Sequence, residues 1–339
     1  MQFEPIFATS SSKVALQPEP GWRRVQIRQI EDLDCAVPGA GLRAMQLSRQ
    51  SVTGSLVFAG GDDVVLSSGY LRGRISLAGP LPQRHITIGL GLNFAAGARH
   101  WLREVGTGCV GLAQPGAEHD AIYADGSLYL KVTLSEDRLL AEAEHEGLAL
   151  DAAVIRQSGV HPRSLAPAAL DRLRRWAVGA HRGAMADGET LVRFRARALA
   201  AVVQHLGRSP RVAPGLPSIG GHERIVARAR AWIDAQLGEP IGINDIAAAA
   251  GASRRTLSRA FFDVLEESPW AYVTRLRLHR IRSDLVAHAI SAPRIAEASN
   301  RWGVGELGRM SGRYKAMFGE LPSETARAAK TRALLLPRL

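Results

Sequence analysis

The chain has 339 residues, with 43 Lys and Arg against 32 Asp and Glu, so its formal net charge is +11. This length exceeds the size at which one hydrophobic core usually keeps growing, and it predicts two domains. Two distant cysteines, Cys35 and Cys109, argue against a disulfide framework or a cysteine-rich metal site, and we interpret both as small buried hydrophobes. With no signal-peptide pattern and no run of about 18 apolar residues, we expect a cytoplasmic protein without a membrane span.

Residues 20–134 have the pattern of short strands interrupted by glycine. Apolar, β-branched runs occur at 55–58, 64–66, 85–88, 109–112 and 128–133. Turn signals such as Gly79-Pro80 and Pro115-Gly116 separate these runs. Many short strands without long helices between them favour an antiparallel β-barrel or sandwich.

Residues 135–206 carry helical signals instead. Ser135 can cap a helix that ends near Gly147, and amphipathic stretches follow at 170–177 and 191–206. We predict that these two stretches form a helical hairpin. The sequence leaves open whether the hairpin packs on the β region or against a second subunit.

Residues 207–221 form the best linker candidate, because they are rich in proline and glycine and lack periodicity. The linker divides an N-terminal domain, residues 1–206, from a C-terminal domain, residues 222–330. From residue 222 onward there are 19 Lys and Arg against 12 Asp and Glu. Clustered positive charge favours a polyanionic partner such as DNA.

The C-terminal domain repeats one helix-turn-helix pattern. In each copy a short helix of small residues ends at a glycine, Gly251 or Gly303, and an amphipathic helix follows. Glycine suits such a turn because it can adopt a positive φ without a steric penalty. A helix of about 18 residues after Ser268-Pro269 joins the copies and spans about 27 Å, which suits two helices one DNA turn apart, about 34 Å.

The second helix of each copy is a candidate recognition helix. In the first copy, Ser253 can cap the helix and Leu257 and Phe261 face inward. The outer face, which we predict to contact DNA, carries Arg254, Arg255, Ser258 and Arg259. In the second copy, Gly308 and Gly312 stand where the first has Arg255 and Arg259, so we expect mainly phosphate contacts there. The predicted DNA-binding residues of this copy are Glu306, Leu307, Arg309, Arg313 and Lys315.

Residues 222–329 resemble the DNA-binding domain of the AraC/XylS family of bacterial transcription regulators. The resemblance is carried by Ile246-Ala247, Gly251-Ala252-Ser253, Leu257-Ser258-Arg259, Phe261, Ser268-Pro269, Trp302-Gly303 and Phe318-Gly319 through Ser323. The sequence departs from the family pattern at Gly312, where arginine is expected. The resemblance implies a sequence-specific, effector-responsive regulator, more often an activator, that works with RNA polymerase and has no catalytic activity or cofactor. It also implies that residues 1–206 form a cupin-like sensing and dimerisation domain, with a small-molecule effector and a homodimer.

Two alternatives involve chemistry. A cupin-type metal enzyme would need clustered histidines, but His85, His100, His119 and His145 are widely separated and show no ligand spacing. We interpret His119, between two acidic residues, as part of a solvated turn and predict no metal site. A cysteine-based DNA-repair protein would need an activated thiolate, which two isolated cysteines do not provide. Trp232, Trp270 and Trp302 fit core packing better than base stacking. The arginines of the joining helix fit either phosphate contacts or a solvated face.

Overall fold

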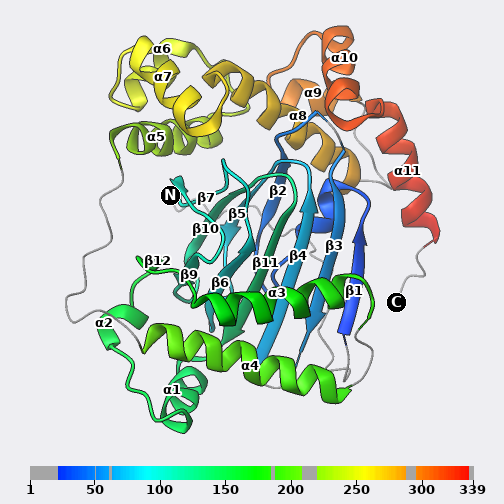
Figure 1. Ribbon diagram of the computed structural model, residues 1–339. Helices are drawn as coiled ribbons and strands as arrows, with labels where there is room; N and C mark the ends of the chain where they lie inside the picture. Colours follow the sequence, from blue (N-terminus) through cyan, green and yellow to red (C-terminus); the bar gives the residue numbers. More distant parts are fainter. Residues whose placement is uncertain are drawn as a thin grey trace, which may run out of the picture.

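The computed structural model describes residues 22–49, 51–60, 63–184, 188–207, 220–287 and 295–335. Strands dominate the chain from Trp22 to Leu134, and helices with one two-residue strand follow to Leu206 (Figure 1). Every described element from Gly221 onward is helical. Most of the predicted linker, residues 208–219, lies outside the described residues. The change from strands to helices follows the change of periodicity in the sequence.

The N-terminal strands form two antiparallel sheets. The larger contains, in spatial order, β1 (Trp22–Ile27), β3 (Thr53–Ala59), β4 (Val64–Arg72), β11 (Ser127–Leu134), β6 (Ile86–Asn93), β9 (Val110–Ala113) and β12 (Gly159–Val160). The smaller contains β2 (Arg43–Gln46), β5 (Ile75–Pro80), β10 (Glu118–Tyr123), β7 (Arg99–His100) and β8 (Arg103–Glu104). Both sheets are open at their edges, so the domain is a sandwich and the barrel alternative is wrong.

Strand β11 shows how the larger sheet is buried on both faces. Leu128, Leu130 and Val132 point into a core shared with the helices, whereas Tyr129 points into the core between the sheets. This alternation follows from the two-residue period of a strand. A strand buried on both faces has few polar residues, and each polar residue that remains needs an explanation.

Helices cover the outer face of the larger sheet (Figure 1). They are α1 (Glu136–His145), α2 (Ala152–Ile155), α3 (Pro167–His181) and α4 (Gly188–Leu206). Phe194 and Val202 of α4 and Leu173 of α3 join the same apolar core as the strand residues Leu90 and Val132. The predicted helical hairpin therefore packs on the sheet. A short 3-10 helix, η1 (Ile30–Leu33), follows β1.

The C-terminal helices form two small cores joined by one long helix. They are α5 (Gly221–Ala235), α6 (Ile243–Ala249), α7 (Arg254–Leu265), α8 (Pro269–Ala287), α9 (Ile295–Arg301), α10 (Leu307–Phe318) and α11 (Pro322–Leu335). Helix α8 gives Tyr272 and Val273 to the first core and Leu278 and Ile281 to the second. It therefore spans both repeats, as the sequence predicted.

Several local predictions were wrong. Gly79 and Pro80 do not form a turn, because they are the last residues of β5 and pair with His119 and Glu118 of β10. Cys109 is buried as predicted, but Cys35 is exposed. Trp270 is 47% exposed and lies outside the core, whereas Trp232 and Trp302 pack against it. Within the described ranges, no helix is both long and apolar enough to cross a membrane.

Candidate nucleic-acid interface

The first repeat places α7 as an outward-facing helix. Gly251 has a φ of 63°, which turns the chain between α6 and α7. The Ser253 hydroxyl caps α7 by accepting a hydrogen bond from the backbone N–H of Thr256, at 3.1 Å. Leu257 and Phe261 are fully buried. The opposite face of α7 must therefore point away from the core.

The predicted DNA-binding residues of α7 lie on this outer face. Arg254, Arg255 and Arg259 are exposed, and Ser258 is partly exposed. Arg254 donates a hydrogen bond from Nε to the side chain of Asn244 on α6. Among the described residues, the guanidinium groups of Arg255 and Arg259 have no partner. Two unpaired guanidinium groups on one exposed helix can donate to phosphate or to the acceptor edge of guanine.

The second repeat has the same inward face and a different outer face. Met310 and Tyr314 are buried at the positions that match Leu257 and Phe261. Gly308 and Gly312 are exposed, and a Cβ added at either glycine would meet no atom within 4 Å. The surface of α10 is therefore open at the two positions where α7 carries arginine.

The charged residues of α10 lie elsewhere on the helix. Arg309 forms an ion pair with Glu306 at 3.0 Å, and Leu307 is 39% exposed. Arg313 and Lys315 are exposed, and neither has a partner within the described part of the chain. The two helices therefore present charge at different positions on their exposed faces.

Sequence reasoning missed the role of the α8 arginines, which neither face solvent freely nor remain available for phosphate. Arg277, which is 7% exposed, donates to the carbonyl oxygens of Leu237 at 3.2 Å, Glu239 at 2.8 Å and Gly303 at 3.2 Å. It thereby satisfies carbonyls from both repeats. Burial lowers its pKa from the usual value. Arg280 pairs with Asp234 at 2.6 Å and lies over the Trp302 ring.

The helical module also packs on the sandwich through ion pairs. Arg230 of α5 pairs with Asp120 of β10 at 2.7 Å, and Arg282 of α8 pairs with Glu31 of η1 at 2.6 Å. The packing leaves the outer faces of both recognition helices exposed. In Figure 1, α5 lies between α7 and the sandwich, and α10 lies at the outer side of the module.

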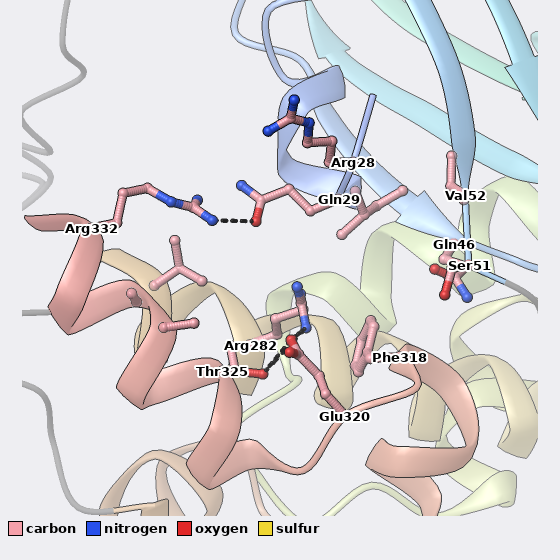
Figure 2. A pocket seen from close by; sticks show the side chains of 14 residues that line it. Arg28, Gln29, Gln46, Ser51, Val52, Arg282, Phe318, Glu320, Thr325 and Arg332 are labelled. Atoms are coloured by element: carbon pink, nitrogen blue, oxygen red, sulfur yellow. Dashed lines mark hydrogen bonds and ion pairs between the residues drawn. The ribbon is translucent and has the colours of Figure 1, made fainter. Parts of the chain in front are cut away.

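A cavity of about 190 Å³ lies between the helical module and the sandwich edge (Figure 2). Arg282 lines the cavity and donates a hydrogen bond to the Glu320 carboxylate at 2.6 Å. Arg332 also lines it and donates to the Gln29 side chain at 3.1 Å. Both arginines are thus held by the protein. We interpret the cavity as part of the packing between the two regions.

The structure also places the residues named for the two alternatives that involve chemistry. His119 does not lie in a solvated turn; it is 6% exposed on β10 and points between the sheets. In the ranges that the structure describes, no group of three or more His, Cys, Asp or Glu residues could hold a metal ion. Cys109 is buried, and burial raises its pKa to about 11, which opposes thiolate formation.

The comparisons with known proteins concern the C-terminal region. Residues 246–328 match the family described as "Helix-turn-helix domain". The "Probable thc operon regulatory protein" of Rhodococcus erythropolis is 30% identical over 119 residues, which cover 35% of this chain and 34% of that protein. The "XylDLEGF operon transcriptional activator" of Pseudomonas putida is 32% identical over 108 residues, or 32% of each chain.

A crystal structure described as a probable AraC family transcriptional regulator from Rhodopseudomonas palustris is 31% identical in sequence, with a TM-score of 0.30. The match covers 31% of this chain and 97% of the chain in that crystal structure. The C-terminal region is therefore a helix-turn-helix domain of the AraC type. The chain spans about a third of the length of these two curated relatives.

Proposed function

We propose that the protein is a sequence-specific DNA-binding transcription regulator, and that it acts as an effector-responsive activator. The observation that carries this proposal is the tandem pair of helices α7 and α10. Both helices bury side chains at matching positions, and both are exposed on the opposite face. Helix α8, with 19 residues, spans about 28 Å and contributes to both cores. The pair thereby suits two successive segments of one major groove.

The two helices have different roles in this proposal. Arg255 and Arg259, helped by Arg254 and Ser258, read base edges from α7. The second helix contacts the phosphate backbone through Arg309, Arg313 and Lys315, with Glu306 and Leu307 at its start. Because glycine offers no side-chain hydrogen bond at positions 308 and 312, the specificity resides mainly in the first repeat.

The proposal includes partners and a division of labour. Residues 1–206 form the domain that binds a small-molecule effector and forms a homodimer. Residues 207–221 link this domain to residues 222–330, which bind duplex DNA and contact RNA polymerase. The protein has no enzymatic activity and works in the cytoplasm, where its DNA target lies. The names of the relatives as operon regulators and activators support this assignment.

Selection from random duplexes tests the proposal. The purified full chain should enrich one motif, with a strong half-site under α7 and a weak half-site about 10 base pairs away. The double variant Arg255→Ala, Arg259→Ala should bind DNA without enriching that half-site. Equal binding of the unaltered protein to all duplexes would overturn the assignment of sequence-specific regulation.

A further inference from the structure

Five buried polar side chains form a closed ring between the two sheets. Lys131 Nζ lies 3.3 Å from His119 Nε2 and 5.3 Å from the centroid of the Tyr129 ring. His119 lies edge-on against His100, and His100 lies edge-on against Tyr123, with ring centroids 5.7 Å apart in both pairs. The rings of Tyr123 and Tyr129 are tilted to each other, with centroids 5.0 Å apart. None of the five is more than 7% exposed. We name them the inner ring.

The inner ring has polar atoms without hydrogen-bond partners. The hydroxyl groups of Tyr123 and Tyr129 and the Nε2 atom of His100 make no hydrogen bond with any described residue. The adjacent hydroxyl of Ser67, opposite Lys131 on β4, has none either. Buried polar groups are normally satisfied, and each exception costs about 1–3 kcal/mol. Four exceptions around one buried lysine therefore point to a ligand.

The charge of the inner ring is also unbalanced. Burial alone lowers the pKa of Lys131 to about 7, and no carboxylate among the described residues opposes this shift. Burial, with a smaller effect of Lys131, lowers the pKa of His100 to about 3, so this imidazole is neutral. A buried ammonium is stable only when an anion pairs with it.

The larger sheet leaves room beside Lys131. Lys131 is the register partner of Gly89 on β6, and Gly89 is the partner of Gly111 on β9. A Cβ added at Gly89 would meet only one atom, at 4.0 Å, and a Cβ at Gly111 would meet His100 and Trp101 at 3.6 Å. The two glycines thus leave a part of the sheet surface next to the Lys131 ammonium group without side chains.

We propose that the inner ring binds a small organic anion, a short-chain carboxylate, which is the effector of this regulator. The carboxylate accepts hydrogen bonds from Lys131 and the unpaired tyrosine hydroxyl groups, and its carbon chain lies over Gly89 and Gly111. The identity as effector rests on the proposed function, whereas binding of the anion does not.

Strand β10 connects the inner ring to the DNA-binding helices. His119 and Tyr123 of β10 belong to the ring, and the alternate residues Asp120 and Ile122 face the helical module. Asp120 pairs with Arg230, whose Nε donates to the Tyr272 hydroxyl of α8 at 3.2 Å. Ile122 packs in the core that contains Leu257 and Phe261. A shift of β10 on anion binding would therefore move the first repeat.

Thermal unfolding and calorimetry of the full chain test the binding step. The probes are formate, acetate, propionate and butyrate, with propionamide as the neutral control. At least one carboxylate should raise Tm and propionamide should not. Lys131→Met should weaken its binding by at least about tenfold. The matched control Lys330→Met removes an exposed charge and should bind like the unaltered protein.

Two outcomes would overturn the site: no response to any of the four carboxylates, or an equal response in Lys131→Met. Lys131→Met should remain folded because methionine has no charge to desolvate, and Tyr129→Phe gives an independent, milder variant that should also weaken binding. DNA selection without any carboxylate reports separately on the proposed function. A protein that selects a motif and ignores the anions would refute only this inference.

The coupling step has its own test. The bound carboxylate should change the affinity of the unaltered protein for its selected DNA. Asp120→Asn should still bind the carboxylate but lose the change in DNA affinity, and Asp120→Glu should restore part of it. An unchanged DNA response in Asp120→Asn would show that the Asp120–Arg230 ion pair does not transmit the signal.

Discussion

The two helix-turn-helix repeats have similar buried faces and different exposed faces. Leu257, Phe261 and Leu265 of α7 match Met310, Tyr314 and Phe318 of α10, and all six are buried. On the outer faces, Arg255 and Arg259 match two glycines. The first core also includes Met45, Leu102 and Ile122 of the sandwich, whereas the second is a smaller separate cluster. Packing thus preserves the buried face of a repeat while its exposed residues differ.

The largest effect on stability should come from the matching buried residues of α7 and α10. Phe261→Ala removes a fully buried ring and should lower the free energy of unfolding by about 3–5 kcal/mol. Tyr314→Phe at the matching position removes the hydroxyl group, which donates to Thr325 Oγ1 at 2.9 Å, and should cost about 1 kcal/mol. Urea unfolding measures both. Equal losses in the two variants would contradict this expected order.

Acid should loosen the second repeat before the first. Burial lowers the pKa of His279 on α8 to about 3, and its Nε2 accepts a hydrogen bond from the backbone N–H of Gln46 at 3.1 Å. Because the folded pKa lies below the unfolded value near 6.5, the stabilisation is complete above pH 6.5 and is lost as the pH falls toward 3. Hydrogen exchange in α10 should therefore rise in this range. His279→Gln should flatten the pH dependence; an unchanged profile would exclude His279 as the cause.

Arginine removal should separate base reading from phosphate binding. Arg255→Ala should cost about 1–3 kcal/mol on the selected duplex and relax the preference at one base pair. Arg313→Ala should instead weaken binding to all duplexes alike. It should also lower the slope of log K against log salt concentration by about one. Salt titrations on selected and scrambled DNA distinguish the two. A sequence-selective loss in Arg313→Ala would contradict the division of labour between the repeats.

The smallest effect tests the glycine surface of α10. Gly312→Arg meets no neighbour at its Cβ and should stabilise the helix by about 0.8–1 kcal/mol, because glycine is a poor helix former. It should also raise the salt slope of DNA binding by about one. Gly312→Ala is the control that provides the helix propensity without the charge. Equal DNA affinity of the two variants would place position 312 away from the duplex.

The repeats could be read from the sequence because their signals are local. Gly251 and Ser253 mark a turn and a cap, and the buried residues recur at helical spacing, so α7 was predicted within the bounds that the structure gives. The same holds for α10 and for the length of α8. The interpretation of the α8 arginines failed because their partners are distant in sequence. Arg277 bonds to carbonyls 26 to 40 residues away, and Arg282 to Glu31, 251 residues away.

The inner ring was equally hidden from sequence reasoning. His100, His119 and Lys131 have no motif spacing, and His119 lies between two acidic residues that suggested a solvated turn. Sheet pairing decided otherwise, because β10 pairs with β5 and β7 and turns alternate residues inward.

By itself, the sequence determined the helical periods, the caps and the duplicated register, since each depends on neighbours a few residues apart. Only the tertiary structure decided which charged groups face solvent, which pair across the two regions and which lie between the sheets. The physical reason is that hydrogen bonds and burial depend on distance in space, and sheet pairing and domain packing bring together residues that the chain keeps far apart.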